Sequence, residues 1–524
     1  MDFTPKSPSF FQKASFGASR PIRKLQSHGG SHSLFFLLRR IRWKHLFVLC
    51  MMWILTIHYF ERTAVLSAFN KCKWENWEQW SKDSDPHHSI IIGDPQIVDA
   101  FSYPSRPGLL MWLTRVLADN YHQRNYRLMN KVLKQHSTIF VGDLFDGGRE
   151  WQDKDWFKEF DRFNRIFPTQ KNNRVYQQVP GNHDVGFGTG ISYDVYKRFK
   201  TFFGDADTYV TLGNHTIILL DTVSLSDSEN ELVAKSSREF LNSLQREDHP
   251  AKELPRIVIT HVPLYRNPKE QKCGRYREST KLFPIVKGKQ YQTVIEYKYS
   301  REILDWIKPK LILSGDDHDY CHVRHPLGIS GLDEQDHVYN EGHDSVGRDF
   351  SDEITVKSSA MTGGIRWPAV QLLSLWNPGE NIGLNPADSE IWQETCRQTV
   401  LHDTFESHLC YLPDFLMPLI WYGVLAVISY LTLFFCTVLP VQASKLESLL
   451  AALPIFRQKR EILPLSEKLQ NDQFKAKAFK RSVMANILCD WQLPIRPDWL
   501  SFAVESVVLT AFIMYAFQRS ITSI

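Results

Sequence analysis

The sequence predicts an α/β domain that is anchored by about three membrane-spanning helices. Two observations predict this arrangement. Five apolar, strand-like runs each end abruptly in Asp, Asn or His, and segments with helical spacing separate them. Long apolar segments lie on both sides of this alternating region. Because open α/β folds build their sites at the carboxyl ends of strands, the polar strand ends are the first place to look for function.

The composition permits a large core and excludes some classes of function. A chain of 524 residues has room for two or three domains, and 43% hydrophobic residues with 33 Phe and 15 Trp can fill a sizeable core. The net charge of +4, from 62 basic and 58 acidic residues, is too small to indicate a nucleic-acid partner. The eight cysteines form no Cys-x-x-Cys pair, so a zinc ribbon or thioredoxin motif is not supported.

The first 60 residues predict a tail followed by a membrane anchor. Residues 1–40 are rich in Ser, Gly, Lys and Arg and lack apolar periodicity, which is typical of a disordered basic tail. Residues 41–60 combine a basic flank with an apolar run long enough to span a bilayer. A cleaved signal peptide is the alternative. An uncleaved signal anchor is favoured because the charged region is long and no small-residue cleavage site follows.

Two further spans follow the central region, at residues 415–439 and 499–517. Lys and Arg concentrate before the first span and in the segment 440–498, so the positive-inside bias places both regions in the cytosol. The domain 61–414 and a short tail, 518–524, are therefore expected on the lumenal or extracellular side.

Three smaller features accompany this topology. Asn214 begins an Asn-x-Thr glycosylation sequon, which is usable only in the lumen. Cys396 and Cys410 bracket a short segment before the second span and form a candidate disulfide. Glu505 lies within the third span, where it is either a functional group or a residue that faces the other helices.

Strands and helices alternate within the region 61–414. The expected strands cover Ser89–Ile92, Ile139–Val141, Val175–Val179, Arg256–Thr260, Leu311–Ser314, Glu353–Ser358 and Gln371–Leu375. Helical spacing marks Leu109–Ala118, Phe240–Gln245 and Glu302–Ile307, and the polar stretch Pro326–Asp352 reads as a long loop.

The polar groups at the strand ends suit a metal centre. They are Asp94, Asp143, Asn182, His261, Asp316 and His318. Carboxylates, an amide and imidazoles at one sheet edge can hold two divalent ions, with one carboxylate shared, and such a pair can clamp a phosphoryl group. His183, beside Asn182, is then available to protonate a leaving oxygen, and Asp184 to orient that imidazole.

The motifs around these residues resemble those of the calcineurin-like metallophosphoesterases. The segments concerned are Gly93-Asp94, Gly142-Asp143-x-x-Asp146, Gly181-Asn182-His183-Asp184, Thr260-His261 and Gly315-Asp316-Asp317-His318. The resemblance implies a four-layer α/β/β/α sandwich. It also implies that Asp94 and His318 bind one metal and that Asp143 bridges. By the same correspondence, Asn182, His261 and Asp316 bind the second metal, and His183 is the catalytic imidazole.

Two positions depart from the family pattern. Gln96 stands where the first motif usually has a histidine, and Asp316 replaces the first histidine of the last motif. Exchanging imidazole for oxygen favours harder ions, so manganese is expected rather than zinc. The departures also leave open a metal-poor descendant that has kept only the shape.

Two interpretations are open for several residues next to the ligand candidates. Asp146 either supports the site or caps its loop, and Arg149 and Tyr265 either contact the substrate phosphate or have no such role. Cys321 is either a packed thiol or the disulfide partner of Cys273, and the pairing of Cys72 stays open.

A closer resemblance covers nearly all of Ser89 to Leu412. The extended motifs Gly142–Arg149, Gly181–Gly188, Thr260–Leu264 and Ser314–Cys321 are similar to membrane-bound enzymes of fungi and animals that remodel glycosylphosphatidylinositol (GPI) anchors. This implies a manganese enzyme that removes an ethanolamine-phosphate side branch from an anchor mannose, the second rather than the first. The implied substrate is a GPI-anchored protein or GPI glycolipid.

The same resemblance implies a cellular setting. The expected location is the endoplasmic reticulum membrane, with cycling to the Golgi left open, and the expected partner is the cargo-export machinery. Two alternatives remain at this stage. One is an inactive pseudo-phosphoesterase that acts as a receptor for GPI-anchored cargo. The other is a lumenal phosphoprotein or nucleotide phosphatase.

Overall fold

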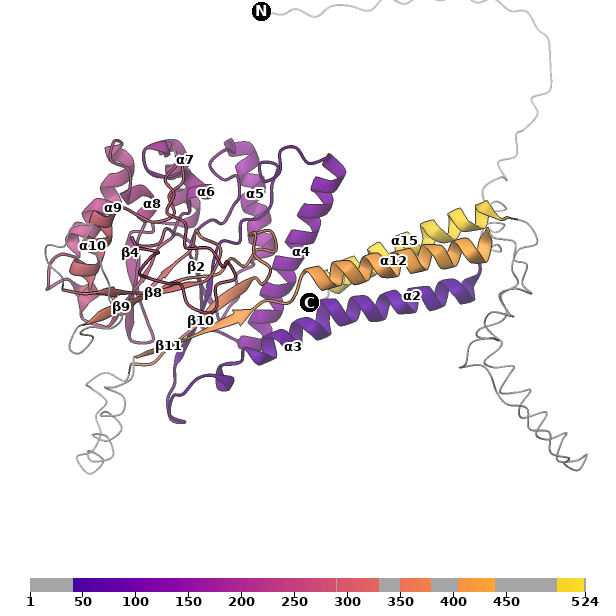
Figure 1. The fold of residues 1–524 in the computed structure, drawn as a ribbon, viewed down its shortest axis with the longest axis horizontal. Coiled ribbons are helices and arrows are strands. Elements are labelled where there is room, and N and C mark those ends of the chain that lie inside the picture. The colour runs from indigo at the N-terminus through magenta and orange to yellow at the C-terminus, as the bar shows by residue number, and fades with distance from the viewer. Residues whose placement is uncertain (1–40, 289, 329–348, 378–403, 439–496, 523–524) are drawn as a thin grey trace, which may run out of the picture. The chain divides into compact units, whose positions relative to one another are not determined.

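Residues 41–288, 290–328, 349–377, 404–438 and 497–522 are described by the computed structural model (Figure 1). The larger of two units comprises residues 52–426 and 513–524, and the smaller comprises residues 1–51 and 427–512. The predictions for the tail 1–40, for most of the segment 440–498, for the centre of the loop Pro326–Asp352 and for Cys396 lie outside the described residues.

Eleven described strands form two sheets in the larger unit. The first sheet has the order β11-β10-β1-β2-β3 and the second β4-β5-β6-β7-β9-β8. The first consists of β1 (His87–Ile92), β2 (Ser137–Phe140), β3 (Arg174–Tyr176), β10 (Ala369–Leu375) and β11 (Phe405–Tyr411). The second consists of β4 (Thr208–Leu212), β5 (His215–Leu219), β6 (Arg256–Ile259), β7 (Leu311–Ser314), β8 (Cys321–Pro326) and β9 (Phe350–Thr355).

Parallel pairing dominates the centre of each sheet and gathers the strand ends. In the first sheet β1 pairs in parallel with β2, and β2 with β3, so that Ile91 lies opposite Ile139. In the second sheet β5, β6, β7 and β9 pair in parallel. The pairs β1–β10 and β10–β11 of the first sheet and β4–β5 and β8–β9 of the second are antiparallel. The central strands of each sheet therefore deliver their carboxyl ends to one edge.

The helices of the larger unit follow the strands in sequence. They are α4 (Gly108–Leu133), α5 (Asp153–Ile166), α6 (Asn182–Val185), α7 (Tyr193–Phe203), α8 (Thr222–Leu225), α9 (Glu231–Ser243) and α10 (Tyr297–Ile307). Helix α3 (Ala64–Lys71) also belongs to this unit, whereas residues of α2 (Trp43–His58), α12 (Leu416–Thr437) and α15 (Trp499–Thr522) are divided between the two units.

The side chains of the strands divide between two apolar clusters by the two-residue period of a strand. Ile91 belongs to a cluster that joins the facing sides of the two sheets, together with Ile257 and Leu313. Its neighbours Ile90 and Ile92 instead join a cluster that contains the apolar faces of the helices. Both faces of each sheet are thus covered, one by the other sheet and one by helices. This is the expected four-layer α/β/β/α sandwich.

Most expected elements are present, and the differences have local causes. The run expected to be a strand up to Val179 keeps strand structure only from Arg174 to Tyr176, since only these residues pair with β2. The helical pattern Leu109–Ala118 continues to Leu133, although polar residues obscure its periodicity. Strand β11 was not expected; it closes the first sheet by pairing along its whole length with β10.

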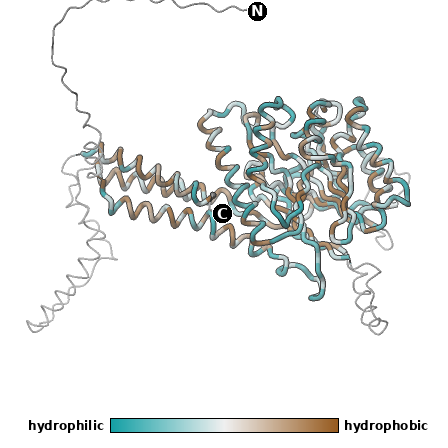
Figure 2. The backbone as a smooth tube through the Cα atoms, turned by 180° about the vertical axis from the view of Figure 1, so that it is seen from behind, coloured by the Kyte–Doolittle hydropathy of each residue, from teal (hydrophilic) through white to brown (hydrophobic). Residues whose placement is uncertain are grey.

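Among the described residues, three helical segments are long and apolar enough to cross a membrane: Trp43–Lys71, Leu416–Thr437 and Trp499–Ile521. Figure 2 shows hydrophobic residues along most of α12 and α15. The helix of the first span passes through a π turn (Tyr59–Thr63) into α3 instead of ending near residue 60. Helix α15 continues to Thr522, beyond residue 517, where the third span is expected to end. The Arg62 guanidinium donates to the Ser520 carbonyl in its last turn.

A buried ion pair joins the π turn to the domain within the larger unit. The carboxylate of Glu61 accepts hydrogen bonds from the Arg124 guanidinium of α4 at 2.6 Å and from the Tyr422 hydroxyl of α12 at 2.7 Å. Glu61 and Arg124 are each 5% exposed or less. Removing one partner of such a pair would leave a buried charge unpaired, at a cost of about 3–5 kcal/mol.

A disulfide between Cys72 and Cys410 strengthens the same junction. It ties the residue after α3 to β11, which lies 338 positions further along the chain. The expectation that Cys410 pairs with Cys396 is therefore wrong. Cys410 is buried in β11 in the same apolar cluster as Cys72, so its partner is remote in sequence.

In the smaller unit the Glu505 side chain forms a hydrogen bond at the N-terminus of a helix. Its carboxylate accepts a hydrogen bond of 2.9 Å from the backbone N–H of Arg42, directly before α2. A helix N-terminus has unpaired N–H groups and a partial positive charge, which a carboxylate satisfies. Of the two readings of Glu505, the structure confirms that it faces another helix.

A pair of carboxyl groups, Asp207 and Asp221, generates a prediction on stability. Asp207 accepts hydrogen bonds from the Asp221 N–H and the Ser237 hydroxyl. Burial, followed by the charge of Asp221, raises the pKa of Asp207 to about 7, and burial also raises the pKa of Asp221. The other ionisable groups around the pair are Tyr196, Lys200 and Asp205.

We expect Asp207→Asn to stabilise the protein more at high than at low pH. The unfolded Asp loses its proton near pH 4, whereas folded Asp207 keeps it to about pH 7. The folded state therefore binds more protons in this interval, and the free energy of unfolding falls as the pH rises. The difference in melting temperature between variant and wild type, measured in detergent, should increase from pH 5 to pH 8. A difference independent of pH would contradict the shift.

Candidate metal centre

Polar residues that follow strands of both sheets meet at one edge. Asp94 follows β1 and Asp143 follows β2 in the first sheet, and Asn182 is the first residue of α6 after β3. His261 follows β6, and Asp316 and His318 follow β7 in the second sheet. All of these residues except His318 are buried, and each of them is at most 6% exposed.

The backbone at this edge is held in an uncommon conformation. Eight non-glycine residues of the described chain have positive φ, and five of them are Asp94, Gln96, Asp143, Asp316 and His318. Such conformations are costly for residues with a Cβ atom and tend to cluster at functional sites. The sharp turns aim the side chains back over the strand ends instead of along the strands.

Two glycines allow the strand ends to approach closely. A Cβ atom on Gly181 would lie 2.0 Å from Oδ1 of Asp143, which no packing rearrangement accommodates. Gly142 has a φ of +97°, and a Cβ atom there would lie 2.6 Å from the His261 ring. The Gly-Asp and Gly-Asn pairs of the motifs thus provide the space that the polar groups need.

His261 presents one nitrogen to three oxygens. Its Nδ1 donates to the Val141 carbonyl at 2.8 Å, which leaves the lone pair of Nε2 pointing into the site. Nε2 lies 3.2 Å from Oδ1 of Asn182, 3.3 Å from Oδ1 of Asp143 and 3.7 Å from Oδ1 of Asp316. These four atoms form one group of potential ligands.

Asp94 and His318 offer a second set of donors. Nδ1 of His318 donates to the Gly363 carbonyl at 2.9 Å, so its Nε2 is also an acceptor. Oδ1 of Asp94 accepts the Asp316 N–H. Oδ2 of Asp94 and Oδ2 of Asp316 are buried and have no hydrogen-bond partner among the described residues. The donor atoms of Asp94, Asp143 and His261 lie within 4.8 Å of one another.

These residues fit divalent cations. Burial, and then the charge of Asp143, raises the pKa of Asp94 to about 7, although His261 opposes the shift. Burial and the charges of Asp143 and Asp94 also raise the pKa of Asp316. Buried carboxylates this close repel one another unless positive charge lies between them. Carboxylate, amide and imidazole donors are ligands that divalent metals accept.

Gln96 lies against the shared carboxylate. Its Nε2 donates to Oδ2 of Asp143 at 2.7 Å, and its backbone N–H donates to the Asp143 carbonyl at 2.9 Å. The amide therefore holds the orientation of Asp143.

His183 is paired with Asp146 and not with Asp184. Nδ1 of His183 lies 2.6 Å from the Asp146 carbonyl and 3.1 Å from its carboxylate, and the His183 side chain remains 30% exposed. The expected role of Asp184 in orienting the imidazole is wrong. Its buried carboxylate accepts the N–H groups of Leu144, Phe145 and Gly181, and so fixes the loop after β2. At the third position of α6 it points back toward the helix start, away from the imidazole.

The candidate residues outside the ligand set occupy different environments. Arg149 donates to the Asn182 carbonyl at 2.8 Å, so it supports the loop that carries Asn182. Tyr265 packs edge-on against Tyr297, with ring centroids 5.4 Å apart, and belongs to the small apolar cluster of Cys273 and Cys321. Asn214 is exposed in the turn between β4 and β5, where its side chain donates to the Asn377 carbonyl.

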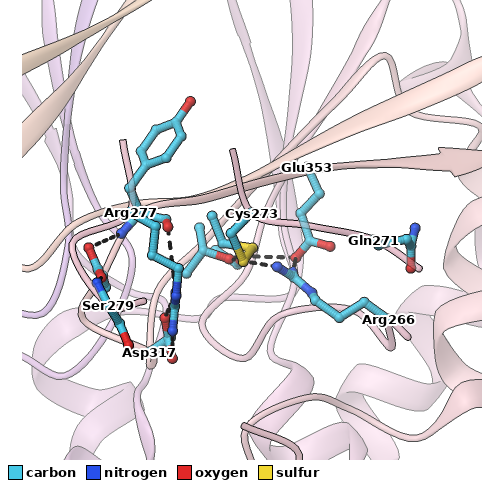
Figure 3. The surroundings of a disulfide bond; sticks show 12 residues. Arg266, Gln271, Cys273, Arg277, Ser279, Asp317 and Glu353 are labelled. Atoms are coloured by element: carbon cyan, nitrogen blue, oxygen red, sulfur yellow. Dashed lines mark hydrogen bonds and ion pairs between the residues drawn. A yellow bond between two sulfur atoms is a disulfide. The ribbon is translucent and has the colours of Figure 1, made fainter. Parts of the chain in front are cut away.

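A disulfide links Cys273 to Cys321, which resolves the open reading of Cys321 (Figure 3). Ion pairs flank it: Arg277 with Asp317 on one side, and Arg266 with Glu353 at 2.8 Å on the other. Asp317 lies between Asp316 and His318 in sequence, so the loop of Cys273 is fastened to the metal-ligand segment. Sequence reasoning missed Arg277, because an arginine in a loop without periodicity carries no signal of its partner.

The fold and the site define a metal-dependent phosphoesterase. The family model described as calcineurin-like phosphoesterase matches residues 84–320. The chain belongs to this family and is a hydrolase of phosphoric esters.

Relatives support the assignment. The chain is 43% identical over 375 residues to "Cell division control protein 1" of Saccharomyces cerevisiae. The aligned region covers 72% of this chain and 71% of the relative. It is 28% identical over 233 residues to "Metallophosphoesterase 1" of Mus musculus, covering 41% of this chain and 58% of the relative. The chain is 25% identical over 271 residues to "Metallophosphoesterase 1" of Danio rerio, and this match covers 49% of this chain and 68% of the relative.

We expect Asp143→Asn to lower the metal content of the folded protein. The substitution removes the charge of the carboxylate that faces both sets of donors and keeps its shape. Metal equivalents are to be measured by mass spectrometry after manganese loading and desalting, and Asp161→Asn, at an exposed position of α5, is the matched control. An unchanged metal content in Asp143→Asn would contradict a shared role for this carboxylate.

Proposed function

We propose that the protein is a two-metal phosphodiesterase that removes an ethanolamine-phosphate side branch from a mannose, the second rather than the first, of GPI anchors. The resemblance of the motifs to the GPI-remodelling subgroup and the similarity to the named metallophosphoesterases support this proposal. One structural observation carries it furthest: the domain that holds the metal centre is tied to membrane-type helices by a buried ion pair and a disulfide. Such ties suit a substrate that lies in the membrane.

The donor sets support the assignment of ligands. In this proposal Asp94 and His318 hold one ion, Asn182, His261 and Asp316 hold the other, and Asp143 is shared. The ions would supply positive charge to the phosphoryl oxygens and make a water molecule more acidic. Oxygen donors prevail in this set, and Gln96 replaces an imidazole, so manganese is preferred over zinc.

The chain's own residues position the reacting groups. Asp146 holds His183 through both its carbonyl and its carboxylate, so the other imidazole nitrogen is directed outward. The partial exposure of this side chain makes it accessible to a bound diester. His183 then donates a proton to the leaving mannose oxygen, which is a poor leaving group without it. The backbone N–H of His183 meanwhile donates to Oδ1 of Asp143 and keeps the two groups in register.

The proposed location is the endoplasmic reticulum membrane, with the domain 61–414 in the lumen and a role in the export of GPI-anchored proteins. Two disulfides in this domain support an oxidising compartment. The exposed position of Asn214 at a turn also suits a glycan. The clustering of basic residues outside this domain supports the same orientation.

A catalytically inactive receptor for GPI-anchored cargo is the second candidate, and the departures at Gln96 and Asp316 are the observations that favour it. The two candidates differ in metal content: about two equivalents support the enzyme, and none supports the receptor. A lumenal phosphatase for soluble nucleotides or phosphoproteins would have no need of the tie between the domain and the membrane-type helices.

We expect His183→Gln to lower kcat by roughly 10²–10⁴-fold while the metal content stays near that of the wild type, since the side chain is assigned to proton transfer. Asp146→Asn should lower kcat less, because the Asp146 carbonyl still holds the imidazole. Activity toward an artificial phosphodiester and bound manganese are to be measured on the same samples. Loss of the metals in His183→Gln would instead identify a ligand or a structural residue.

We expect GPI glycans from cells that lack the protein to retain an ethanolamine phosphate on one mannose. Mass spectrometry of the released glycans identifies the mannose, and re-expression of the wild type should remove the group. Re-expression of Asp143→Asn should not remove it. Glycans identical to those of the parent cells would contradict the proposed function, and restoration by the variant would favour the receptor.

A further inference from the structure

A cavity of about 660 Å³ lies in the larger unit, beside the helix that leaves the first span. One wall is a stripe of the π turn and α3 with a four-residue spacing, Tyr59, Thr63, Ser67 and Lys71, and the adjacent Ala64 and Ala68. The facing wall comes from β11 and the residues that lead into α12, including Tyr411. We call this cavity the junction groove.

The groove exists because small residues face it. Thr63, Ala64, Ser67 and Ala68 carry little side-chain volume, whereas Val65 and Phe69 on the opposite side of α3 are fully buried in the core. The disulfide from Cys72 to Cys410 fixes the end of this helix against β11. The two walls are thus held at a set distance, and the space between them is left unfilled.

The lining of the groove is apolar and aromatic. Tyr59, Tyr276, Trp367 and Tyr411 line it, and each of them stays partly exposed, from 40% for Tyr276 and Tyr411 to 54% for Tyr59. Tyr and Trp concentrate where membrane proteins meet the lipid headgroups. The helices that border the groove are the end of the first candidate span and the start of the second. This placement suits a lipid and not a water-soluble ligand.

Lys71 gives the groove a charge at one end. Its side chain is exposed, and no carboxylate of the described chain lies within ion-pair distance of it. The acidic residue of the lining, Asp414, is already paired with Arg366 at 2.6 Å. From Tyr59 to Lys71 the stripe runs about 18 Å along the helix axis, which is more than half of a hydrocarbon core of about 30 Å. An acyl chain can therefore lie along the stripe with an anionic group at Lys71.

The rim of the groove is connected to the metal centre. Trp367 lies four residues after Gly363, whose carbonyl accepts the hydrogen bond of His318, so the two positions are at most about 14 Å apart. The Glu278 carboxylate accepts the backbone N–H groups of Arg366 and Trp367 and the ammonium of buried Lys357. A second cavity of about 480 Å³, lined by His318 and Gly363, adjoins the same segment. A ligand with a lipid end and a phosphoester end can reach both places.

We propose that the junction groove binds the lipid end of the glycolipid substrate, with a hydrocarbon chain along the stripe of α3 and the lipid phosphate at Lys71. This inference rests on the proposed function, because it takes the substrate to be a glycan linked to a lipid. By fixing the lipid end, the groove then determines which part of the glycan lies at the metal centre, so that the phosphodiester branch reaches it. Lipid-bearing substrates are selected over free glycans of the same structure.

The first test compares two substrates of the full-length protein in nanodiscs, a GPI glycolipid and its delipidated glycan. Ser67→Trp and Ala68→Trp fill the groove, and we expect each to lower the ratio of kcat/KM for the glycolipid to that for the delipidated glycan at least tenfold. Asn70→Trp adds the same bulk to an exposed position of α3 outside the groove and should keep the wild-type ratio. Lys71→Glu should lower the ratio and the matched Lys73→Glu should not.

The second test requires no variant. A GPI glycolipid with a photoreactive acyl chain should crosslink to the segment Tyr59–Lys71 of the wild type, and excess unlabelled glycolipid should prevent this. The proposed lipid site would be contradicted if both Trp variants kept the wild-type ratio of kcat/KM values, or if the crosslinks were confined to α15. Failure of the proposed function is distinguishable: the wild type would then hydrolyse an artificial phosphodiester and neither glycan, whereas the crosslinking result would still decide the groove.

Discussion

The repulsion between buried carboxylates at the strand ends is the constraint on which the rest of the site depends. Asp94, Asp143 and Asp316 reach the edge from different strands and are each at most 6% exposed. Packing and positive-φ turns hold them there although two of their oxygens have no hydrogen-bond partner in the part of the chain that the structure describes. The folded chain therefore retains an unfavourable arrangement of negative charge that divalent cations relieve. Glycines, the Gln96 amide and the loop fixed by Asp184 all serve to keep this arrangement in place.

A second constraint acts at the membrane end of the larger unit. Glu61 is a charged residue within a long apolar helix, and it is buried only because Arg124 and Tyr422 satisfy it. The interaction fixes the π turn against α4 and the start of α12, and the Cys72–Cys410 disulfide fixes the following helix against β11. Both ties lie on the borders of the junction groove or directly beside it. The features that attach the domain to its helices therefore also shape the place where we expect the lipid.

The sequence predicts those features that depend on short-range pattern. The strand ends, the ligand candidates and the three spans follow from apolar runs and from the residues that end them. The structure brings five of the strand-end groups together and places the sixth, His318, after the same strand as Asp316. Pairings between remote segments could not be predicted. Cys410 pairs with Cys72 across 338 positions, Asp146 and not Asp184 contacts His183, and Arg277 binds Asp317 from a loop without periodicity. In each of these cases the tertiary fold determines which residue becomes the partner. From the sequence alone, a residue closer in the chain with suitable chemistry is an equally reasonable partner.

The two departures from the family pattern become coherent when charge is counted. Gln96 is neutral like the histidine it replaces, and its amide donates to Asp143. Asp316 instead adds a negative charge where the family pattern has a neutral imidazole. In the proposed two-metal site this charge reduces the net positive charge that faces the substrate. It is consistent with retained metal binding, because an added carboxylate strengthens the attraction for cations instead of weakening it.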